Sequence, residues 1–243
     1  MRRFGLLGFP LTHSFSQGYF TEKFQRENIT DAGYENFSLE RIELLHDVLK
    51  NYPDLAGLNV TIPYKKQVLP FLADATETVK EMGACNCIKI TDGKLYGYNT
   101  DTTGFRSSLV PFLKPSHTRA LILGTGGASA AVAFVLRQLG IGYLFVSRRP
   151  YEDAISYEMI DETILDSHQL IINTTPLGMY PNVDACPPLP YHYLTAGHHL
   201  YDLTYNPPET LFLKQGREAG ATIQNGREML VLQAEESWEI WNS

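Results

Sequence analysis

Short runs in which apolar and polar residues alternate fill the first part of the chain, and between them apolar residues recur every three or four positions. The first pattern predicts β-strands and the second predicts amphipathic helices. Strands are predicted at 2–8, 34–39, 55–62, 86–90 and 95–98, and helices at 17–28, 40–51, 64–72 and 76–82. The turn Thr91-Asp92-Gly93-Lys94 predicts a hairpin between the last two strands. This order is typical of an open α/β sheet packed between helices.

A second α/β pattern starts just after residue 103. A predicted helix at 104–113 leads into the polar linker Lys114-Pro115-Ser116-His117, and an apolar strand at 119–123 follows. After it come a glycine turn, an alanine-rich helix up to residue 139, and strands at 143–147, 170–173, 200–203 and 221–224. Their spacing predicts βα units of one parallel sheet. Residues 227–241 have one apolar face and predict a closing helix.

Composition narrows the class of protein. With 243 residues, of which 44% are hydrophobic, the chain is long enough for two modest cores. The net charge of −7 is dispersed and no stretch clusters Lys and Arg with aromatic residues, so no nucleic-acid partner is expected. No apolar run approaches the ~20 residues that span a bilayer, and no cleavage signature is present, so no membrane contact and a cytoplasmic location are expected. The three cysteines are predicted to be reduced thiols, and the histidines lack the spacing of a metal site.

The residues Gly124-Thr125-Gly126-Gly127-Ala128 are a shortened variant of the glycine fingerprint of nucleotide-binding folds. Small residues in this turn let the main chain approach a pyrophosphate at the positive end of a helix. A strand precedes the motif and a helix follows it, which is the context that the fingerprint requires. We therefore predict a Rossmann-like nucleotide-binding domain, and an ordinary glycine-rich turn is the alternative.

The ends of the next two strands bear on the choice of cofactor. Domains that bind NAD usually carry Asp or Glu after the second strand, where it holds the ribose 2′-hydroxyl. This chain has Ser147, Arg148 and Arg149 there, and two guanidinium groups suit a 2′-phosphate, so NADP is favoured over NAD. A solvated basic pair is the alternative. After the third strand, the polar loop 173–179 predicts nicotinamide contact, with a capped Asn and Thr turn as the equal alternative.

Polar residues of the first domain gather where its strands end. These residues are Ser14, Ser16, Asn59, Thr61, Lys65, Asn86, Asn99 and Asp101. Because the carboxyl ends of parallel strands line one edge of an open sheet, we expect their hydroxyl, amide, ammonium and carboxylate groups to converge. Such a pocket suits a small polyhydroxylated anion.

Eight short motifs along nearly the whole chain carry a family resemblance. They are His13-Ser14-Phe15-Ser16, Asn59-Val60-Thr61-Ile62-Pro63-Tyr64-Lys65, Gly83-Ala84-Cys85-Asn86, Gly97-Tyr98-Asn99-Thr100-Asp101, Gly124-Thr125-Gly126-Gly127-Ala128-Ser129, Asn173-Thr174-Thr175-Pro176, Tyr201-Asp202-Leu203-Thr204-Tyr205 and 225–233 (NGREMLVLQ). Together, in this order, they resemble the signatures of the shikimate/quinate dehydrogenase family, and of shikimate dehydrogenases in particular.

The resemblance implies a fold and a reaction. It implies two open-sheet α/β domains with a cleft between them: a discontinuous substrate-binding domain of residues 1–102 plus 227–243, and a Rossmann-like NADP-binding domain of residues 103–226. The implied reaction is the NADP-dependent, reversible reduction of 3-dehydroshikimate to shikimate in aromatic amino acid and chorismate biosynthesis. The expected partners are this substrate and NADP(H), and the expected assembly is a monomer or a homodimer.

The resemblance also implies roles for individual residues. Ser14 and Ser16 would bind the substrate carboxylate, close to Tyr205, and Lys65 and Asp101 would form the catalytic pair. The residues that would hold ring hydroxyls or the reacting oxygen are Thr61, Asn86, Asp101 and Gln233. The residues expected at the cofactor are Gly124, Gly126, Gly127, Ala128, Ser147, Arg148, Arg149, Asn173, Thr174 and Gly226.

The chemistry of the groups fits these roles. Hydride transfer to a ketone builds negative charge on its oxygen, so a positioned proton donor lowers the barrier, typically by a factor of ~10²–10⁴ in rate. Lys65 would supply that proton, and the Asp101 carboxylate would orient the ammonium group. On residue type alone, a solvated lysine such as Lys66 is the more common situation.

Three departures from the family pattern bear on the cofactor and substrate. Gln17 and Phe15 replace a common Pro and Lys, and Glu228 occupies a position commonly held by Gly near the nicotinamide. The stretch between Arg149 and Leu170 is short, so one helix flanking the adenosine is expected to be missing. Two alternative functions remain: a quinate/shikimate dehydrogenase that uses NAD, and a non-catalytic relative that binds NADP.

Overall fold

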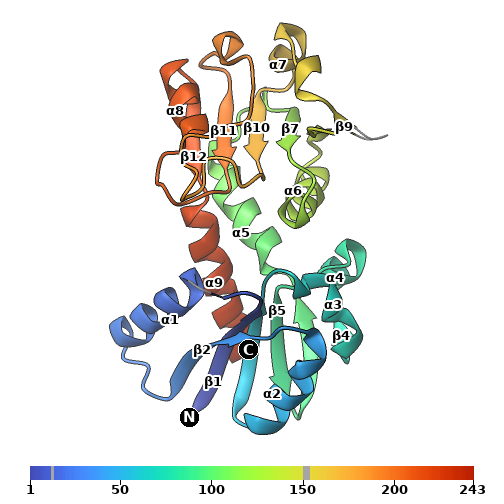
Figure 1. The fold of residues 1–243 in the computed structure, drawn as a ribbon, viewed down its shortest axis with the longest axis vertical. Helices are drawn as coiled ribbons and strands as arrows, with labels where there is room; N and C mark the ends of the chain where they lie inside the picture. Colours follow the sequence, from blue (N-terminus) through green and yellow to red (C-terminus); the bar gives the residue numbers. More distant parts are fainter. Residues whose placement is uncertain (12–13, 150–153) are drawn as a thin grey trace. The chain divides into compact units, whose positions relative to one another are not determined.

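The structure, a computed structural model, describes all residues of the chain except 12–13 and 150–153. The chain forms two compact units: Met1–Thr103 together with Val231–Ser243, and Gly104–Leu230. Each unit contains one six-stranded sheet with helices, so the predicted class of two open-sheet α/β domains is confirmed (Figure 1). The last helix, α9 (Arg227–Asn242), begins in the second unit and ends in the first.

The sheet of the first unit has the strand order β2-β1-β3-β5-β6-β4. Its strands are β1 (Arg2–Gly8), β2 (Ala32–Ser38), β3 (Leu55–Val60), β4 (Asp74–Ala75), β5 (Cys87–Thr91) and β6 (Lys94–Tyr98). β1 runs parallel to β2 and β3, whereas β5 runs antiparallel to both β3 and β6. The predicted hairpin joins β5 to β6, with positive φ angles at Asp92 and Gly93. The sheet is therefore mixed.

Because β5 runs antiparallel to β3, Asn86 reaches the polar edge of the sheet for a different reason from the one predicted. Asn86 precedes β5, and Cys87 pairs with Asn59 near the carboxyl end of β3. The start of an antiparallel strand lies beside the end of its neighbour, so Asn86 reaches the same edge as Lys65. The expectation that Asn86 lies at the carboxyl end of a parallel strand is therefore wrong.

Helices cover both faces of the first sheet. On one face, α1 (Phe15–Arg26) and α9 pack their aromatic residues on Phe4, and the Phe4 and Trp241 rings stack with centroids 4.7 Å apart. On the other face, Leu7 packs with apolar residues from α2 (Leu45–Asn51), α3 (Tyr64–Gln67) and α4 (Glu77–Met82). Side chains alternate along β1, so Phe4 and Leu7 supply two separate cores.

The strands of the second unit are all parallel in the residues that the structure describes, in the order β12-β11-β10-β7-β8-β9. They are β7 (Arg119–Leu123), β8 (Gly142–Val146), β9 (Ala154–Ile155), β10 (Leu170–Asn173), β11 (His199–Asp202) and β12 (Thr222–Asn225). The helices are α6 (Gly127–Gln138), α7 (Glu162–Ser167) and α8 (Leu211–Glu218), with α5 (Thr100–Leu109) leading into the unit. Between β8 and β10, α7 is the single α-helix within the described residues, in line with the short sequence there.

The core of the second unit also has two sides. Leu121, Ile171 and Leu200 pack with Phe212 of α8 on one face of the sheet. On the other face, the hydroxyl groups of Tyr201 and of Ser108 on α5 form a hydrogen bond of 2.7 Å. Among the described residues, no helix has both the length and the apolar character that crossing a membrane requires.

Candidate active site

The proposed catalytic side chains, Lys65 and Asp101, contact each other directly. Lys65 lies on α3, just beyond the end of β3, and its carbonyl accepts a 2.8 Å hydrogen bond from the main-chain N–H of Cys85. Asp101 lies in the first turn of α5. Lys65 Nζ is 2.6 Å from Asp101 Oδ2, and the side chains are 28% and 15% exposed. The ammonium group is thus held by a carboxylate, on a side chain that is partly exposed.

Two further predicted substrate residues, Asn86 and Gln233, come together next to this pair. Asn86 is buried, and its Nδ2 donates hydrogen bonds to Gln233 Oε1 at 3.3 Å and to Thr100 Oγ1 at 3.1 Å. Gln233 belongs to α9, so the last helix of the chain contributes a side chain to the first unit. Thr100 directly precedes Asp101, which links the amide pair to the Lys65–Asp101 pair through the main chain.

The start of α1 presents the two predicted serines. Ser14 caps the helix, because its Oγ accepts a 3.1 Å hydrogen bond from the N–H of Gln17. Ser16 lies in the first turn and contacts the hydroxyl of Tyr34, whose pKa burial raises well above its usual value. A helix N-terminus carries partial positive charge, so hydroxyls placed there suit a carboxylate. His13 of the same motif lies outside the described residues.

Thr61 lies at the same sheet edge, and two other predicted pocket groups, Asn59 and Asn99, are buried beside it. The N–H of Thr61 donates to Leu7 O at 2.9 Å, which fixes the residue directly after β3. Asn59 is buried and bonds to Tyr34 and Ser237, and Asn99 is buried and donates to Ala84 O at 2.9 Å. Their amides bond within the unit, as the amide of Asn86 does.

The glycine turn of the second unit has the open space that a nucleotide requires. Gly124 has a φ of 99°, and a Cβ there would lie 2.8 Å from Thr175 Cγ2, so the turn packs closely on the loop after β10. A Cβ on Gly126 or Gly127 would meet no atom within 4 Å. Here α6 begins, and the first N–H groups of a helix have no partners within it. Gly126, Gly127 and the exposed Ala128 therefore fit a pyrophosphate against this helix end.

The predicted 2′-phosphate residues follow the neighbouring strand. Ser147, Arg148 and Arg149 come directly after β8, and the N–H of Gly124 donates to Val146 O at 2.8 Å, so the two turns are adjacent. Both arginines are exposed, and the N–H of Arg149 donates to Ser147 Oγ at 3.3 Å. This arrangement places two guanidinium groups at the same sheet edge as the glycine turn.

The loop after β10 is held by its own side chains. Thr174 donates its N–H and its hydroxyl to Leu123 O at 2.9 and 2.7 Å. Asn173 is fully buried, donating to Asp202 Oδ1 at 3.0 Å and accepting from the N–H of Thr175 at 3.0 Å. This is the capped turn that was the alternative for this loop. Asp202 accepts further hydrogen bonds, but burial dominates and raises its pKa to about 6.

Tyr205, Gly226 and Glu228 also belong to the second unit. Tyr205 lies beyond β11 and is 38% exposed. The N–H of Gly226 donates to Thr204 O at 3.1 Å, which joins the start of α9 to the segment after β11. Glu228 is an exposed residue in the first turn of α9.

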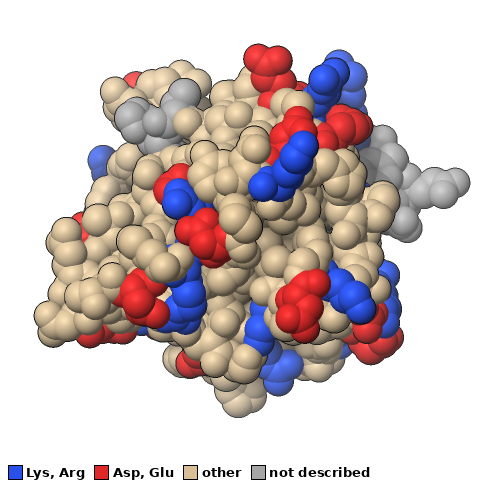
Figure 2. Space-filling model, turned by 90° about the horizontal axis from the view of Figure 1, so that it is seen from below, with Lys and Arg blue, Asp and Glu red and all other residues tan. Residues whose placement is uncertain are grey.

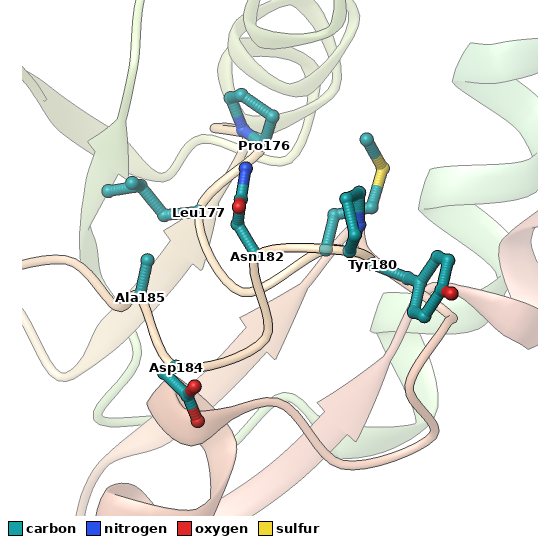
Figure 3. A pocket seen from close by; sticks show the side chains of 8 residues that line it. Pro176, Leu177, Tyr180, Asn182, Asp184 and Ala185 are labelled. Atoms are coloured by element: carbon teal, nitrogen blue, oxygen red, sulfur yellow. The ribbon is translucent and has the colours of Figure 1, made fainter.

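Past Asn173 and Thr174, the same loop encloses a pocket of about 630 Å³ that sequence reasoning missed. Figure 3 shows the loop folding back on itself, with Asn182 turned toward Pro176 and with Tyr180 and Asp184 on either side of Asn182. The signal in the sequence was weak, because a short run of Pro, Gly and polar residues indicates a loop without indicating a hollow. Thr100, Ser237 and Asp202 were likewise not singled out.

Charge is spread over the surface rather than concentrated. Figure 2 shows basic and acidic side chains next to each other on the face in view. Ion pairs at the surface include Arg2 with Asp31 at 3.0 Å and Arg3 with Asp54 at 3.2 Å. Within the part of the chain that the structure describes, no three His, Cys, Asp or Glu side chains are grouped so that they could hold a metal ion.

Comparisons with known proteins agree with this geometry. The profile of the shikimate dehydrogenase substrate binding domain matches residues 6–88. A relative from Caldicellulosiruptor saccharolyticus named shikimate dehydrogenase (NADP(+)) is 36% identical over 259 residues, which cover 99% of this chain and 92% of the relative.

Solved structures extend the likeness to the whole fold. A chorismate mutase/shikimate 5-dehydrogenase fusion protein from Clostridium acetobutylicum has a TM-score of 0.87 and 34% identity, covering 100% of this chain and 91% of that one. Shikimate 5-dehydrogenase from Thermus thermophilus, in complex with NADP(H) and shikimate, has a TM-score of 0.86 and 29% identity, covering 99% of this chain and 93% of that one. Sequence and fold agree over nearly the full length of this chain and of these relatives. This chain therefore belongs to the shikimate dehydrogenase family.

Proposed function

We propose that this protein is an NADP-dependent shikimate dehydrogenase, which reversibly reduces 3-dehydroshikimate to shikimate for aromatic amino acid biosynthesis. The observation that carries the proposal is the 2.6 Å contact of Lys65 Nζ with Asp101 Oδ2, beside the amides of Asn86 and Gln233. A proton donor and hydrogen-bonding amides at one sheet edge match what a polyhydroxylated ketone requires. We place the reaction in the cytoplasm, with the chain acting as a monomer or a homodimer.

In the proposed mechanism, Lys65 and Asp101 handle the proton. NADPH, when bound, supplies the hydride to the carbonyl carbon. Lys65 Nζ donates a proton to the carbonyl oxygen as its negative charge develops, and Asp101 orients the ammonium group by accepting its hydrogen bond. In the reverse direction, Lys65 takes the proton from the substrate hydroxyl. The carboxylate keeps the ammonium group in one position, so the proton is delivered to one oxygen.

Other residues bind the substrate in this proposal. Ser14 and Ser16 hold its carboxylate at the N-terminus of α1, where the helix charge is favourable. The ring hydroxyls are bound by the side chains of Thr61, Asp101 and Gln233, and by the amide oxygen of Asn86, whose two N–H bonds are used on Thr100 and Gln233. By family resemblance, Tyr205 of the second unit also acts near the carboxylate.

The second unit binds NADP in the same proposal. The open turn at Gly126 and Gly127 accepts the pyrophosphate, because side chains there would occupy the space that it needs. Arg148 and Arg149 bind the 2′-phosphate with charge-assisted hydrogen bonds, which a ribose hydroxyl could not match. Thr174 and Gly226 lie in the segments that would border the nicotinamide.

A spectrophotometric assay tests the proposal. Purified protein is mixed with shikimate or quinate and with NADP or NAD, and the absorbance of the reduced nicotinamide is followed. We expect the highest kcat/KM with shikimate and NADP together. A higher kcat/KM with quinate and NAD would support the alternative dehydrogenase, and binding of NADP without turnover of either acid would support a non-catalytic relative.

A further inference from the structure

Two buried hydroxyl groups, those of Thr100 and Ser237, connect the side chains of Asn86 and Gln233 to the interior. Thr100 is 1% exposed and Ser237 is fully buried. Thr100 Oγ1 accepts from Asn86 Nδ2 at 3.1 Å, and it lies 3.3 Å from Ser237 Oγ. Ser237 Oγ also accepts from Asn59 Nδ2 at 2.8 Å. Neither hydroxyl takes part in the proposed mechanism.

Two main-chain atoms fix the orientation of the Asn86 amide and the direction of the Ser237 hydroxyl. The N–H of Thr100 can only donate, and it donates to Asn86 Oδ1 at 2.6 Å. The amide oxygen of Asn86 is therefore identified, and its Nδ2 must be the atom that points to Gln233 Oε1 at 3.3 Å. At the other end, the carbonyl of Gln233 can only accept, and it accepts from Ser237 Oγ at 2.8 Å.

The hydroxyl proton of Thr100 has two acceptors in reach, Ser237 Oγ and Asn86 Oδ1, each at 3.3 Å. Ser237 uses its single proton on the Gln233 carbonyl, so at the contact between the two hydroxyls Ser237 can only accept. Thr100 Oγ1 in turn keeps a lone pair for Asn86 Nδ2. Both N–H bonds of Asn86 are thereby used, one on Thr100 and one on Gln233. Reversing the Asn86 amide would set donor against donor at the main chain of Thr100.

We propose that Thr100 and Ser237 are positioning residues, which lock the Asn86 amide so that Gln233 directs its amide nitrogen, a hydrogen-bond donor, to the ligand. The oxygen of Gln233 is engaged by Asn86, which leaves its two N–H bonds for a ligand oxygen. The site then favours ligands that offer a lone pair at this position, such as a hydroxyl or carbonyl oxygen, over ligands that offer only a donor. The inference rests on the proposed function for the identity of that ligand.

The test compares Thr100→Val with Thr100→Ser. Valine removes the hydroxyl and nearly keeps the shape, whereas serine keeps the hydroxyl. We expect Thr100→Val to raise KM for shikimate about tenfold, because the Asn86 amide loses an acceptor and no longer holds Gln233. Thr100→Ser should stay within about twofold of the wild type, and KM for NADP should not change in either variant. Equal KM values for shikimate in both variants would overturn the proposal.

Ser108→Ala is the matched control. Ser108 is a fully buried hydroxyl on the same helix, and it bonds to Gly104 O and to Tyr201, away from Asn86 and Gln233. We expect it to lower the melting temperature to a similar extent as Thr100→Val and to leave KM for shikimate unchanged. A rise in KM equal to that of Thr100→Val would assign both effects to loss of stability and overturn the proposal.

A double-mutant cycle separates positioning from a general structural role. If Thr100 acts through Gln233, then adding Thr100→Val to Gln233→Ala should raise KM for shikimate no further. Fully additive effects would show that Thr100 acts independently, which contradicts the proposal.

A measurement that needs no turnover keeps this inference apart from the proposed function. The side-chain amide protons of Asn86 and Gln233 are followed by NMR in the full chain. We expect slow exchange with solvent in the wild type and in Thr100→Ser, and faster exchange in Thr100→Val. Absence of shikimate turnover in the wild type would remove the proposed function alone, whereas equal exchange rates in the two variants would overturn the positioning role.

Discussion

At the scale of the residue, two neighbouring lysines of α3 have different surroundings. Lys65 bonds to Asp101 at 2.6 Å, whereas Lys66 is exposed beside it. We expect Lys65→Ala to lower kcat by a factor of ~10²–10⁴, because the positioned proton donor is lost, and Lys66→Ala to leave kcat unchanged. Steady-state rates with shikimate measure kcat, and a fluorescence titration should give the same NADP affinity for both variants. Equal losses in the two variants would contradict the role of Lys65.

The sequence indicated which polar residues belong to the sheet edge, but not which way their side chains point. The motifs predicted that Lys65, Asp101, Asn86 and Gln233 lie close together. In the structure Lys65 contacts Asp101, and Asn86 contacts Gln233. Asn59 and Asn86 occupy the same kind of position, and both amides are bonded within the unit, but with different partners. The sequence cannot show which partners each asparagine has, since these partners lie far along the chain.

At the scale of the element, two glycines of the turn between β7 and α6 should respond oppositely to alanine. At Gly126 a Cβ meets no protein atom, so Gly126→Ala should keep the melting temperature and raise KM for NADP several-fold by filling the cofactor space. At Gly124 the φ of 99° and the contact with Thr175 oppose any side chain. Gly124→Ala should therefore lower the melting temperature by several degrees.

Thermal unfolding without cofactor, together with NADP titration, separates these two outcomes. A loss of stability in Gly126→Ala with unchanged NADP affinity would show that this glycine serves the fold alone.

Elements were predicted well where the pattern was long. The bounds of β1, β7 and β10 agree with the sequence, because several apolar residues in a row mark a buried strand. β4 and β9 have two residues each and were missed, since so short a strand shows no alternation. The helix predicted at 64–72 divides into α3 and a 3₁₀ turn, Leu69–Phe71, in which Pro70 lacks the N–H that a continuing helix would use.

At the scale of the whole molecule, two buried groups on β11 give opposite dependences of stability on pH. Burial lowers the pKa of His199 to about 4 from 6.5, so between these values the unfolded chain takes up a proton that the folded chain refuses, and acid destabilises the fold. Burial raises the pKa of Asp202 to about 6 from 3.8, so there the folded chain takes up the proton first, and acid stabilises the fold. Each shift corresponds to roughly 3 kcal/mol.

The Asp202→Asn variant should expose the contribution of His199. Between pH 6.5 and 4, its free energy of unfolding should fall by about 3 kcal/mol more than that of the wild type, because the stabilising uptake of a proton by Asp202 is gone. Urea unfolding at a series of pH values measures this difference. His199→Gln should change the slope in the opposite direction, and parallel pH curves for the wild type and Asp202→Asn would contradict the assignment.

The sequence predicted two α/β domains, but it could not predict that β5 runs antiparallel to β3 in the first sheet. The hairpin at 91–94 predicted that β5 pairs antiparallel with β6. The pairing of β5 with β3, however, depends on contacts between distant segments. Only the complete structure brings these segments together, which is why the mixed sheet was not anticipated.

The position of α9 has a consequence for the order in which the protein is made. Trp241 stacks on Phe4 and donates its Nε1–H to Ile88 O at 3.0 Å, across 153 residues of sequence. During synthesis Trp241 leaves the ribosome after the other residues of this core, so the first unit cannot complete its aromatic core until Trp241 has emerged. The second unit is continuous in sequence and has its six strands earlier. The part of the chain that is translated first is therefore the last to finish folding, in contrast to the usual order of domains on the ribosome.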